Sequence, residues 1–521
     1  MQLTQLDSSI FVVYVIGLLI IAAWVSRNER KDHERDTNDY FLAGKSLPWW
    51  AIGASLIAAN ISAEQIIGMS GSGYALGLAI ASYEWMAAIT LIIVGKYFLP
   101  IFLKREIYTM PQFLEQRFDS RVRTIMAIFW LGVYVLVNLT GVLWLGGLAI
   151  NTVAGFDPMF GMIFLAVFSI AYSLYGGLKA VAMTDIIQVT LLVAGGLLLS
   201  YLALDHISNG QGAIAGFSHL TNTIPEKFDM ILSKDNPHYM SLPGLSVLVG
   251  GMWVMNLSYW GCNQYIIQRA LAAKSLDEAH KGIAFAAYIK LFMPIIVVLP
   301  GIAAVVMHPN LSAPDQAYPE MMSLMPSGLK GLVFAALVAA IVSSVASMTN
   351  SISTIFTMDI YTHIAPNKSQ RHYVNIGRMV SLVALCIALV VAEPLLNQFD
   401  QAFQYIQEFT GFFTPGIVAI FFLGLFWKKA NANGALVAAL TSAVLSFLLK
   451  IWWPELPFID RVGMVFIACM ILGVVVSLTT GDNGEEKAVA LHDIQFASSR
   501  VFNLATVGCV VILSALYATW W

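Results

Sequence analysis

Charged residues are scarce in this sequence: Asp, Glu, Lys and Arg together make up 11% of its 521 residues, whereas 58% are hydrophobic. A soluble protein of this length cannot cover its surface with so few charges. Apolar runs of about 20 residues, long enough to cross a bilayer, recur along the chain, without the short alternating segments of a membrane barrel. We therefore expect an all-α, polytopic membrane protein.

Cysteine is also rare, and its spacing matches neither a disulfide framework nor a metal site. We expect the four cysteines to pack in the core. The N-terminus lacks the basic region and cleavage site of a signal peptide, so we expect the first apolar run to remain as a helix. Nothing in the composition indicates a nucleic-acid partner. The cysteines are Cys262, Cys386, Cys469 and Cys509.

The apolar runs predict about fourteen transmembrane helices. A long polar loop separates the sixth from the seventh, at 205–240, and a short helix is expected near Pro319, between the eighth and the ninth. The expected spans are 9–25, 48–77, 79–98, 124–153, 159–175, 184–203, 245–269, 280–307, 331–361, 373–391, 399–427, 432–451, 462–478 and 502–521.

Basic residues collect in alternate connections between these spans. Arg27 and Lys31 follow the first span, Lys104 and Arg105 follow the third, and Arg269 follows the seventh. Short loops on the other side, such as GSGYALG and GFDP, carry none. By the positive-inside rule both termini lie on the outer side of the membrane.

Two of the spans are interrupted by polar and small residues. The span 48–77 carries Asn60, Ser62, Glu64 and Gln65 at its middle, and NLSYWGCNQY interrupts 245–269. Four spans separate the two, so a five-helix unit repeated from each would be inverted in the membrane. Corresponding broken helices in inverted units indicate a transporter with its site at the midplane. The predicted parts are a leading helix at 8–27, repeats at 47–206 and 244–428, and three trailing helices at 429–521.

Several hydrogen-bonding side chains lie deep inside apolar spans. An ion alone at this depth costs about 2.5–3.5 kcal/mol on insertion scales, so Glu84 and Lys290 are expected to face a cavity or each other. Together these groups suit a polyhydroxylated ligand; the alternative is that they hold helices together. The candidates are Gln65, Glu84, Asn256, Lys290 and Gln407.

Apolar plates accompany three of these polar residues on the same helix faces. Met69 lies four residues after Gln65, Tyr259 three after Asn256, and Phe403 four before Gln407, spacings that share a face. Tyr83 precedes Glu84. Plates beside hydrogen-bonding groups suit a pyranose ring, and the alternative is ordinary core packing.

A candidate cation site lies in AAIVSSVASMTNS. Ala340, Ser343 and Ser344 share one helix face, and hydroxyl and carbonyl oxygens suit a hard monovalent cation. Carbonyls freed at a helix break near Ala58 and Ile61 would complete the shell. The alternative for the serines is a bond back to their own helix.

Asp185 opens the TDIIQV segment near the cytoplasmic end of its span. It either helps a cation leave or caps the start of the helix. Glu64 and Glu408 adjoin stronger candidates, and their side chains are left without a predicted role.

Long contiguous strings of this chain resemble the sodium/solute symporter family, in its sodium/glucose cotransporter branch. The resemblance covers nearly the whole sequence. It is carried by DYFLAGKSLPWWAIGASLIAANISAEQ, the YEW at Tyr83, LYGGLKAV with TDIIQ, NQYIIQRALAAKS, KGLVFAALVAAIVSSVASMTNSISTIFTMDIY and FQYIQEFTG.

The resemblance implies a LeuT-like core of two inverted five-helix repeats in the inner membrane, and sodium that is co-transported with sugar. Sugar would be held by Gln65, Glu84, Asn256, Lys290 and Gln407. Tyr259 matches an inner gate, and Met69, Tyr83 and Phe403 match an outer gate. Sodium would be held by the carbonyls of Ala58, Ile61 and Ala340 and the hydroxyls of Ser343 and Ser344, with Asp185 on the exit path.

The expected activity is sodium-coupled import of a neutral hexose, galactose or glucose, by alternating access. One position departs from a galactose-carrying member of the branch, where a serine that touches sugar stands one turn after the YEW glutamate; here it is Ala87. The alternative is a symporter for another polar solute, such as myo-inositol, sialic acid or an amino acid. An anionic solute would favour an arginine in the site, and only Lys290, opposed by Glu84, is available.

Two other classes of membrane protein, a sensor and an enzyme, are alternatives to a transporter. A membrane-bound sensor would need a soluble output domain after the last span, and none is present before Trp521. An enzyme would need a metal cluster or a nucleophile–base pair, and the scattered histidines form neither. We therefore expect no enzymatic activity. The histidines are His206, His219, His238, His308, His363 and His372.

Overall fold

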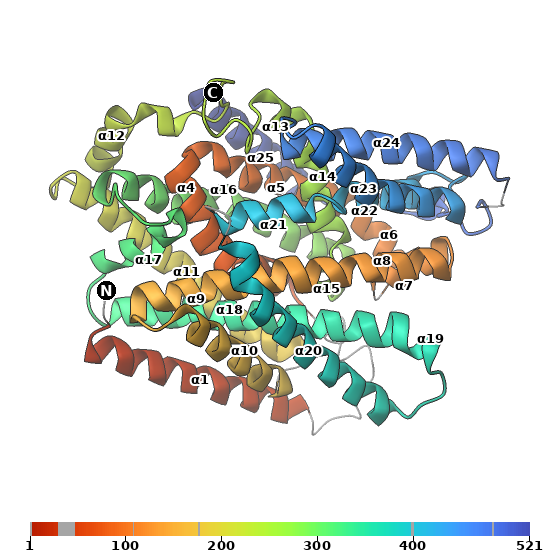
Figure 1. The fold of residues 1–521 in the computed structure, drawn as a ribbon, viewed down its shortest axis with the longest axis horizontal. Helices are drawn as coiled ribbons and strands as arrows, with labels where there is room; N and C mark the ends of the chain where they lie inside the picture. Colours follow the sequence, from red (N-terminus) through yellow and green to blue (C-terminus); the bar gives the residue numbers. More distant parts are fainter. Residues whose placement is uncertain (1–2, 30–46, 108, 176–177, 398–400, 482–483) are drawn as a thin grey trace.

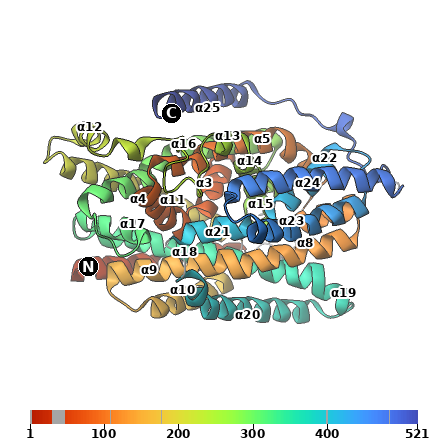
Figure 2. The same cartoon turned by 45° about the horizontal axis from the view of Figure 1, so that its top comes forward.

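The computed structural model describes residues 3–29, 47–107, 109–175, 178–397, 401–481 and 484–521. These residues form no strand, and their one β contact is an isolated parallel bridge between Leu47 and Ala273. The all-α prediction is confirmed. Most of the long helices run side by side along one direction (Figure 1), and the C-terminal helix α25 lies on an outer flank of the bundle (Figure 2).

The first half of the chain folds into helices that cover the first six predicted spans and the loop after them. The predicted long loop contains a short helix of its own, α12. The helices are α1 (Gln5–Glu29), α3 (Trp49–Asn60), α4 (Met69–Leu76), α5 (Ser82–Ile93), α6 (Leu99–Lys104), α7 (Met110–Arg117), α8 (Ser120–Val133), α9 (Thr140–Ala154), α10 (Pro158–Tyr175), α11 (Leu178–Ile207) and α12 (Ala213–Thr223).

The second half repeats this pattern of long helices with interruptions. The short helix expected near Pro319 is α17. The helices are α13 (Leu245–Val249), α14 (Gly251–Leu257), α15 (Gln264–Leu271), α16 (Leu276–Met307), α17 (Ala317–Met321), α18 (Leu329–Thr354), α19 (Thr362–Ile364), α20 (Gln370–Leu396), α21 (Ala402–Thr410), α22 (Thr414–Phe426), α23 (Ala432–Trp452), α24 (Phe458–Thr479) and α25 (Arg500–Thr519).

Among the described residues, nine helical segments are long and apolar enough to cross a membrane, or eleven if each of two bent pairs counts as one span. Two shorter apolar helices, within α1 and α10, coincide with further predicted spans. The chain is therefore a multi-pass membrane protein, and the count of fourteen stays a prediction.

Both predicted interruptions are present. The first span bends by 66° between α3 and the π-helical turn Glu64–Gly68 that leads into α4, and the backbone leaves the helical path at Ile61 (φ −72°, ψ 93°). The second is divided at Asn263, which is extended between the π-helical turn Ser258–Cys262 and α15.

A third interruption was not predicted: α21 and α22 meet at an angle of 44°. The predicted span 399–427 treats them as one helix, which is wrong. The sequence GFFTP between them supplies the physical reason, since Pro415 at the start of α22 removes a backbone donor and fits a helix start.

The bundle is built around α18. Of the most apolar 18 residues of the segment Leu329–Ile364, 89% are buried, against 17% for α25. In a membrane protein the buried helices line the centre and the others face lipid. The helix predicted to carry the cation ligands is thus the central one, and the trailing helix is peripheral.

The two chain ends lie at the same end of the bundle. The carboxylate of Asp7 in α1 accepts hydrogen bonds from the backbone N–H groups of Gly328 and Gly331, at the start of α18. Near the C-terminus the Trp520 carbonyl accepts from the Met230 N–H in the loop after α12. The loops that hold the two ends also meet at α4, where Lys227 Nζ donates to the Tyr74 carbonyl and the Tyr74 hydroxyl donates to the His308 carbonyl.

Candidate functional site

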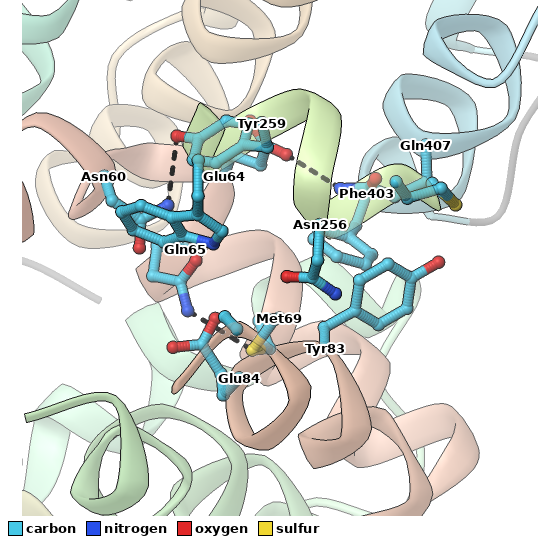
Figure 3. Close-up of a pocket in the computed structure, with 13 residues that line it drawn as sticks. Asn60, Glu64, Gln65, Met69, Tyr83, Glu84, Asn256, Tyr259, Phe403 and Gln407 are labelled. Atoms are coloured by element: carbon cyan, nitrogen blue, oxygen red, sulfur yellow. Dashed lines mark hydrogen bonds between the residues drawn. The ribbon is translucent and has the colours of Figure 1, made fainter. Parts of the chain in front are cut away.

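A cavity with about 440 Å³ of empty space lies between the first broken span, α5, α14 and α21. Figure 3 shows its lining side chains pointing toward one another from these elements. The lining residues are Asn60, Glu64, Gln65, Met69, Tyr83, Glu84, Ala87, Met255, Asn256, Tyr259, Trp260, Phe403 and Gln407.

Four of the five predicted substrate-binding residues line this cavity: Gln65, Glu84, Asn256 and Gln407. They come from four separate elements, so only the folded chain brings them together. Their carboxylate and amide groups present both acceptors and donors to one small volume. Met69, Tyr259 and Phe403, which the spacing argument paired with three of the polar residues, line the same cavity.

The fifth predicted residue, Lys290, is fully buried behind the cavity wall and is not among the lining residues. Its Nζ lies 2.7 Å from Glu84 Oε2 and also donates to Asn60 Oδ1. The same ammonium lies 5.1 Å from the centroid of the Trp260 ring, at cation–π distance. Lys290 therefore positions three groups that do line the cavity.

The outer-gate candidates pack together on one side of the cavity. The rings of Tyr83 and Phe403 meet edge to face with centroids 5.2 Å apart, and Met69 Sδ accepts a hydrogen bond from Gln65 Nε2 at 3.4 Å. Figure 3 shows Phe403 and Tyr83 beside each other next to Asn256. All three gate side chains are buried, so this side of the cavity is closed.

Tyr259 lies at another wall of the cavity and is held by its hydroxyl. Asn60 Nδ2 donates to the Tyr259 oxygen at 3.0 Å, and the Tyr265 hydroxyl lies 3.3 Å from the same oxygen. The dashed line in Figure 3 joins Tyr259 to Asn60. Asn60 and Tyr259 are each half-buried, so this wall is less tightly covered than the Phe403 side.

Glu64 and Asn60 were not predicted to face the site, yet both line it. Gln407 Nε2 donates to Glu64 Oε1 at 3.1 Å, which ties α21 to the first broken span. Asn60 and Glu64 are four residues apart. In an unbroken helix this spacing places two side chains on one helix face. Met255 and Trp260 carry no comparable signal, because apolar residues in apolar spans are ordinary.

The predicted cation ligands lie on α18 and at the end of α3. Ser343 Oγ donates to Asp185 Oδ1 at 2.8 Å. Ser344 Oγ is buried and has no hydrogen-bond partner among the residues that the structure describes. Because buried hydroxyls are ordinarily paired, the free Ser344 oxygen fits a ligand for a cation. Ala340 lies one turn earlier on the same helix, and Ala58 and Ile61 stand at the break where α3 ends.

Asp185 is an interior residue of α11, which begins at Leu178. The alternative that Asp185 caps the start of its helix is therefore wrong. Its carboxylate accepts from Ser343 and pairs with Arg269 Nη2 at 3.5 Å. Asp185 thus lies directly against the candidate cation site.

Arg269 was expected in a cytoplasmic connection but is 1% exposed. Its guanidinium donates to Ser55 Oγ at 2.9 Å and to the Tyr265 carbonyl, besides pairing with Asp185. Arg269 thus joins α3 and α15, which belong to the two broken spans, to α11. Through the bond between Asp185 and Ser343, it is also connected to α18. Counting basic residues by loop could not show this burial.

Known proteins match this chain over most of its length. The sequence model of the Sodium:solute symporter family matches residues 40–442. The chain is 51% identical to a sodium/glucose cotransporter of Vibrio parahaemolyticus, over 100% of this chain and 99% of that protein. It is 33% identical to sodium/glucose cotransporter 4 of Danio rerio (82% and 69% covered) and 31% identical to sodium/myo-inositol cotransporter 2 of Oryctolagus cuniculus (85% and 69%).

Solved structures of other transporters share the fold. A Na⁺-coupled sialic acid symporter in an outward-open state superposes with a TM-score of 0.78 at 23% identity, covering 91% of this chain and 98% of that one. A nucleobase-cation-symport-1 family transporter gives 0.55 at 13% identity, covering 91% and 99%. These likenesses confirm the predicted LeuT-like fold.

Proposed function

As a member of the sodium:solute symporter family, this chain is a sodium-coupled transporter and not an enzyme, and we propose that the solute it carries inward is a neutral hexose, galactose or glucose. One observation supports the neutral class: among the described residues, no lysine, arginine or histidine lines the cavity, whereas Glu64 and Glu84 do. An anionic solute would meet like charge there. Lys290 balances Glu84 from behind the wall.

We assign the sugar contacts to polar groups around the cavity. The amides of Gln65, Asn256 and Gln407 and the carboxylate of Glu84 would share hydrogen bonds with sugar hydroxyls. Lys290 would act by fixing Glu84. Tyr259 would stack on the sugar as the inner gate, and Met69, Tyr83 and Phe403 would close over it as the outer gate.

We assign sodium to the site between α18 and the end of α3. Its ligands would be the carbonyls of Ala58, Ile61 and Ala340 and the hydroxyls of Ser343 and Ser344, with Asp185 on the exit path. Ala58 and Ile61 precede Gln65 by a few residues at the same helix break. Sodium bound there would therefore bias the position of groups that hold sugar, which is the physical basis of coupling.

The driving force is adequate for accumulation. One charge crossing 100 mV is worth about 2.3 kcal/mol, enough for a tens-fold sugar gradient before the sodium gradient is added. We further propose that residues 47–206 and 244–428 form the two inverted repeats, and that the chain lies in the inner membrane with both termini outside. Alternating access would then rock one unit against the other.

A second candidate solute is myo-inositol. It is also a neutral polyol, and one relative at 31% identity carries sodium/myo-inositol cotransporter in its name. The polar groups of the cavity suit both solutes. Selection between a hexose and myo-inositol therefore depends on how well the shape of each solute fits beside Ala87 and its neighbours.

The test is uptake of labelled galactose, glucose, myo-inositol and sialic acid into proteoliposomes, under an inward sodium gradient and under potassium. The proposal predicts sodium-dependent accumulation of a hexose and none of sialic acid. Accumulation of myo-inositol but neither hexose would favour the second candidate. Accumulation of sialic acid would contradict the neutral-solute argument.

A further inference from the structure

An acidic residue outside the predicted sites joins the two half-helices of the outer gate. Asp315 lies in the 3-10 turn Pro314–Gln316, in the loop between α16 and α18, and is 4% exposed. Its Oδ2 accepts a hydrogen bond from the Ala402 N–H at 2.9 Å. Ala402 is the first residue of α21, so Asp315 caps the start of a helix 87 residues away.

The other carboxylate oxygen faces α4. A Cβ atom placed on Gly71 would lie 2.4 Å from Asp315 Oδ1 and 2.8 Å from its Cα. Only glycine permits so close an approach of the loop to the helix. The next residue, Ser72, donates its hydroxyl to Gln401 Oε1 at 2.8 Å, immediately before α21. The loop, α4 and α21 therefore meet at Asp315.

These two half-helices carry the gate over the cavity. Met69 is the first residue of α4, and Phe403, in the first turn of α21, packs on Tyr83. The same short helix carries Gln407, which lines the cavity. The contacts of Asp315 thus hold α21 against α4 in the arrangement that closes the Phe403 side.

Within the described part of the chain, no cation forms an ion pair with Asp315. Its Oδ1 is buried and has no hydrogen-bond partner among the same residues. The elements that pack most closely against the 3-10 turn are α4, α9, α17 and the turn Glu64–Gly68, and α21 is bonded to it through Ala402; none of these elements contains lysine, arginine or histidine. Burial raises the pKa of Asp315 from its ordinary 3.8 to about 7. The titratable groups on those elements are Glu64, Tyr74, Tyr318, Glu320, Tyr405 and Glu408.

We propose that Asp315 is a positioning residue of the transport cycle: it docks α21 against α4 when the outer gate closes, and it enters this closed position with a proton. The proton comes from the solution on that side, binds the free Oδ1, and returns there when the gate reopens. Oδ2 continues to accept from Ala402. No proton crosses the membrane, so the coupling to sodium is unchanged. This inference rests on the proposed function, in which the gate opens and closes.

The direction in which pH changes docking follows from the proton that Asp315 binds in the docked state. The docked state binds the proton more tightly than the undocked state, in which an exposed carboxyl has its ordinary pKa. Raising the pH from about 4 to about 7 therefore lowers the ratio of docked to undocked molecules by about tenfold per pH unit. Above about pH 7 both states are ionised and the ratio stays constant.

The experiment measures docking directly, by the distance between two spin labels. One label replaces the exposed Asn310, in the loop before the 3-10 turn, and the other replaces the exposed Val444 on α23. The background carries Cys386→Ser, because Cys386 is exposed and would also react with the label. Cys262, Cys469 and Cys509 are buried and are kept. Distances are recorded in purified full-length protein from pH 5 to pH 8.

The native residue should give two populations, with the docked one falling about a hundredfold relative to the other between pH 5 and pH 7 and then levelling. Asp315→Asn keeps an acceptor for Ala402 and stays neutral, and it should remain docked throughout. Asp315→Ser, a second neutral cap, should do the same. Glu320→Gln, on α17, should behave as the native protein does.

A population that does not vary with pH in the native protein would overturn the proposal. So would an Asp315→Asn variant that keeps the native pH dependence, or a Glu320→Gln variant that abolishes it. Uptake assays on the same proteins separate this result from the proposed function. If neither hexose accumulates while the distances follow the predicted profile, the assignment of the solute is wrong and the role of Asp315 stands.

Discussion

Lys290 and Glu84 form an ion pair behind the wall of the cavity, with Nζ 2.7 Å from Oε2 and side chains that are 1% and 5% exposed. The pair joins α16 to α5, and the same ammonium reaches Asn60 of the first broken span. A carboxylate held in this way presents its remaining lone pairs to the cavity in a fixed direction. The pair thus connects the stability of the bundle to the geometry of the proposed sugar site.

We predict that Lys290→Ala abolishes sugar uptake and lowers stability. Removing one partner of a buried ion pair costs about 3–5 kcal/mol, because the other charge is left uncompensated. Thermal unfolding in detergent and uptake in proteoliposomes measure the two effects. In the double variant Lys290→Ala with Glu84→Gln, stability should recover in part while uptake should not. Equal uptake by the single variant and the wild type would refute the role of the pair.

We predict that Ala87→Ser strengthens galactose binding. Ala87 lines the cavity one turn after Glu84, and a hydroxyl there adds one hydrogen bond, worth about 0.5–1.5 kcal/mol. The KM for galactose should fall by about two- to tenfold. Competition between galactose and glucose measures the change in preference. Ala88→Ser, at a buried neighbour that does not line the cavity, is the matched control. An unchanged KM in Ala87→Ser would place the sugar elsewhere.

We predict that Ser344→Ala weakens sodium binding without changing sugar contacts. The Ser344 hydroxyl is buried and has no partner in the part of the chain that the structure describes, so its loss should raise the sodium concentration for half-maximal uptake on the order of tenfold. Ser169→Ala is the control, because that buried hydroxyl donates to the Ala166 carbonyl of its own helix. If both variants needed the same sodium concentration for half-maximal uptake, Ser344 would not be a sodium ligand.

We predict that Tyr259→Phe and Tyr259→Ala have different effects. Phenylalanine keeps the ring but loses the hydrogen bonds with Asn60 and Tyr265, each worth about 0.5–1.5 kcal/mol, so sugar release should be several-fold faster with little change in KM. Alanine also removes the plate and should raise KM. Efflux from preloaded liposomes and uptake kinetics separate the two. Identical behaviour of both variants would argue against a stacking gate.

Much of this fold is predictable from the sequence because the membrane imposes simple constraints. The break near Ile61 follows from Asn60, Ser62 and Gln65 in an apolar span, since such groups are costly in lipid. The bend between α21 and α22 was signalled by Gly411 and Pro415, but the segment 402–426 as a whole is long and apolar enough to be read as one membrane span.

The site was predictable in composition but less so in detail. Helix periodicity places Gln65 with Met69 and Asn256 with Tyr259 correctly, because each pair lies within a single turn. It cannot show that Lys290 supports the wall from behind, since a residue's distance from the cavity depends on how neighbouring helices pack. The π-helical turn Glu64–Gly68 changes the helical phase at the break, so the four-residue spacing of Asn60 and Glu64 was not enough to assign Glu64 to the cavity.

The burial of Arg269 could not be predicted from the sequence. Basic residues near the ends of spans are usually read as loop residues, and the predicted orientation rests on a count that tolerates single errors. The contacts of Arg269 with Ser55 and Asp185 come from α3 and α11, which only tertiary structure brings together.

We expect sodium at α18 and sugar in the cavity to bind cooperatively. The most direct measurement is the affinity of purified protein for galactose, by calorimetry, with sodium and with potassium, together with the affinity for sodium with and without galactose. The account predicts that sodium tightens galactose binding, and that galactose tightens sodium binding by the same factor. Ser344→Ala should weaken the effect of sodium. Galactose affinity that is equal in sodium and potassium would contradict the account.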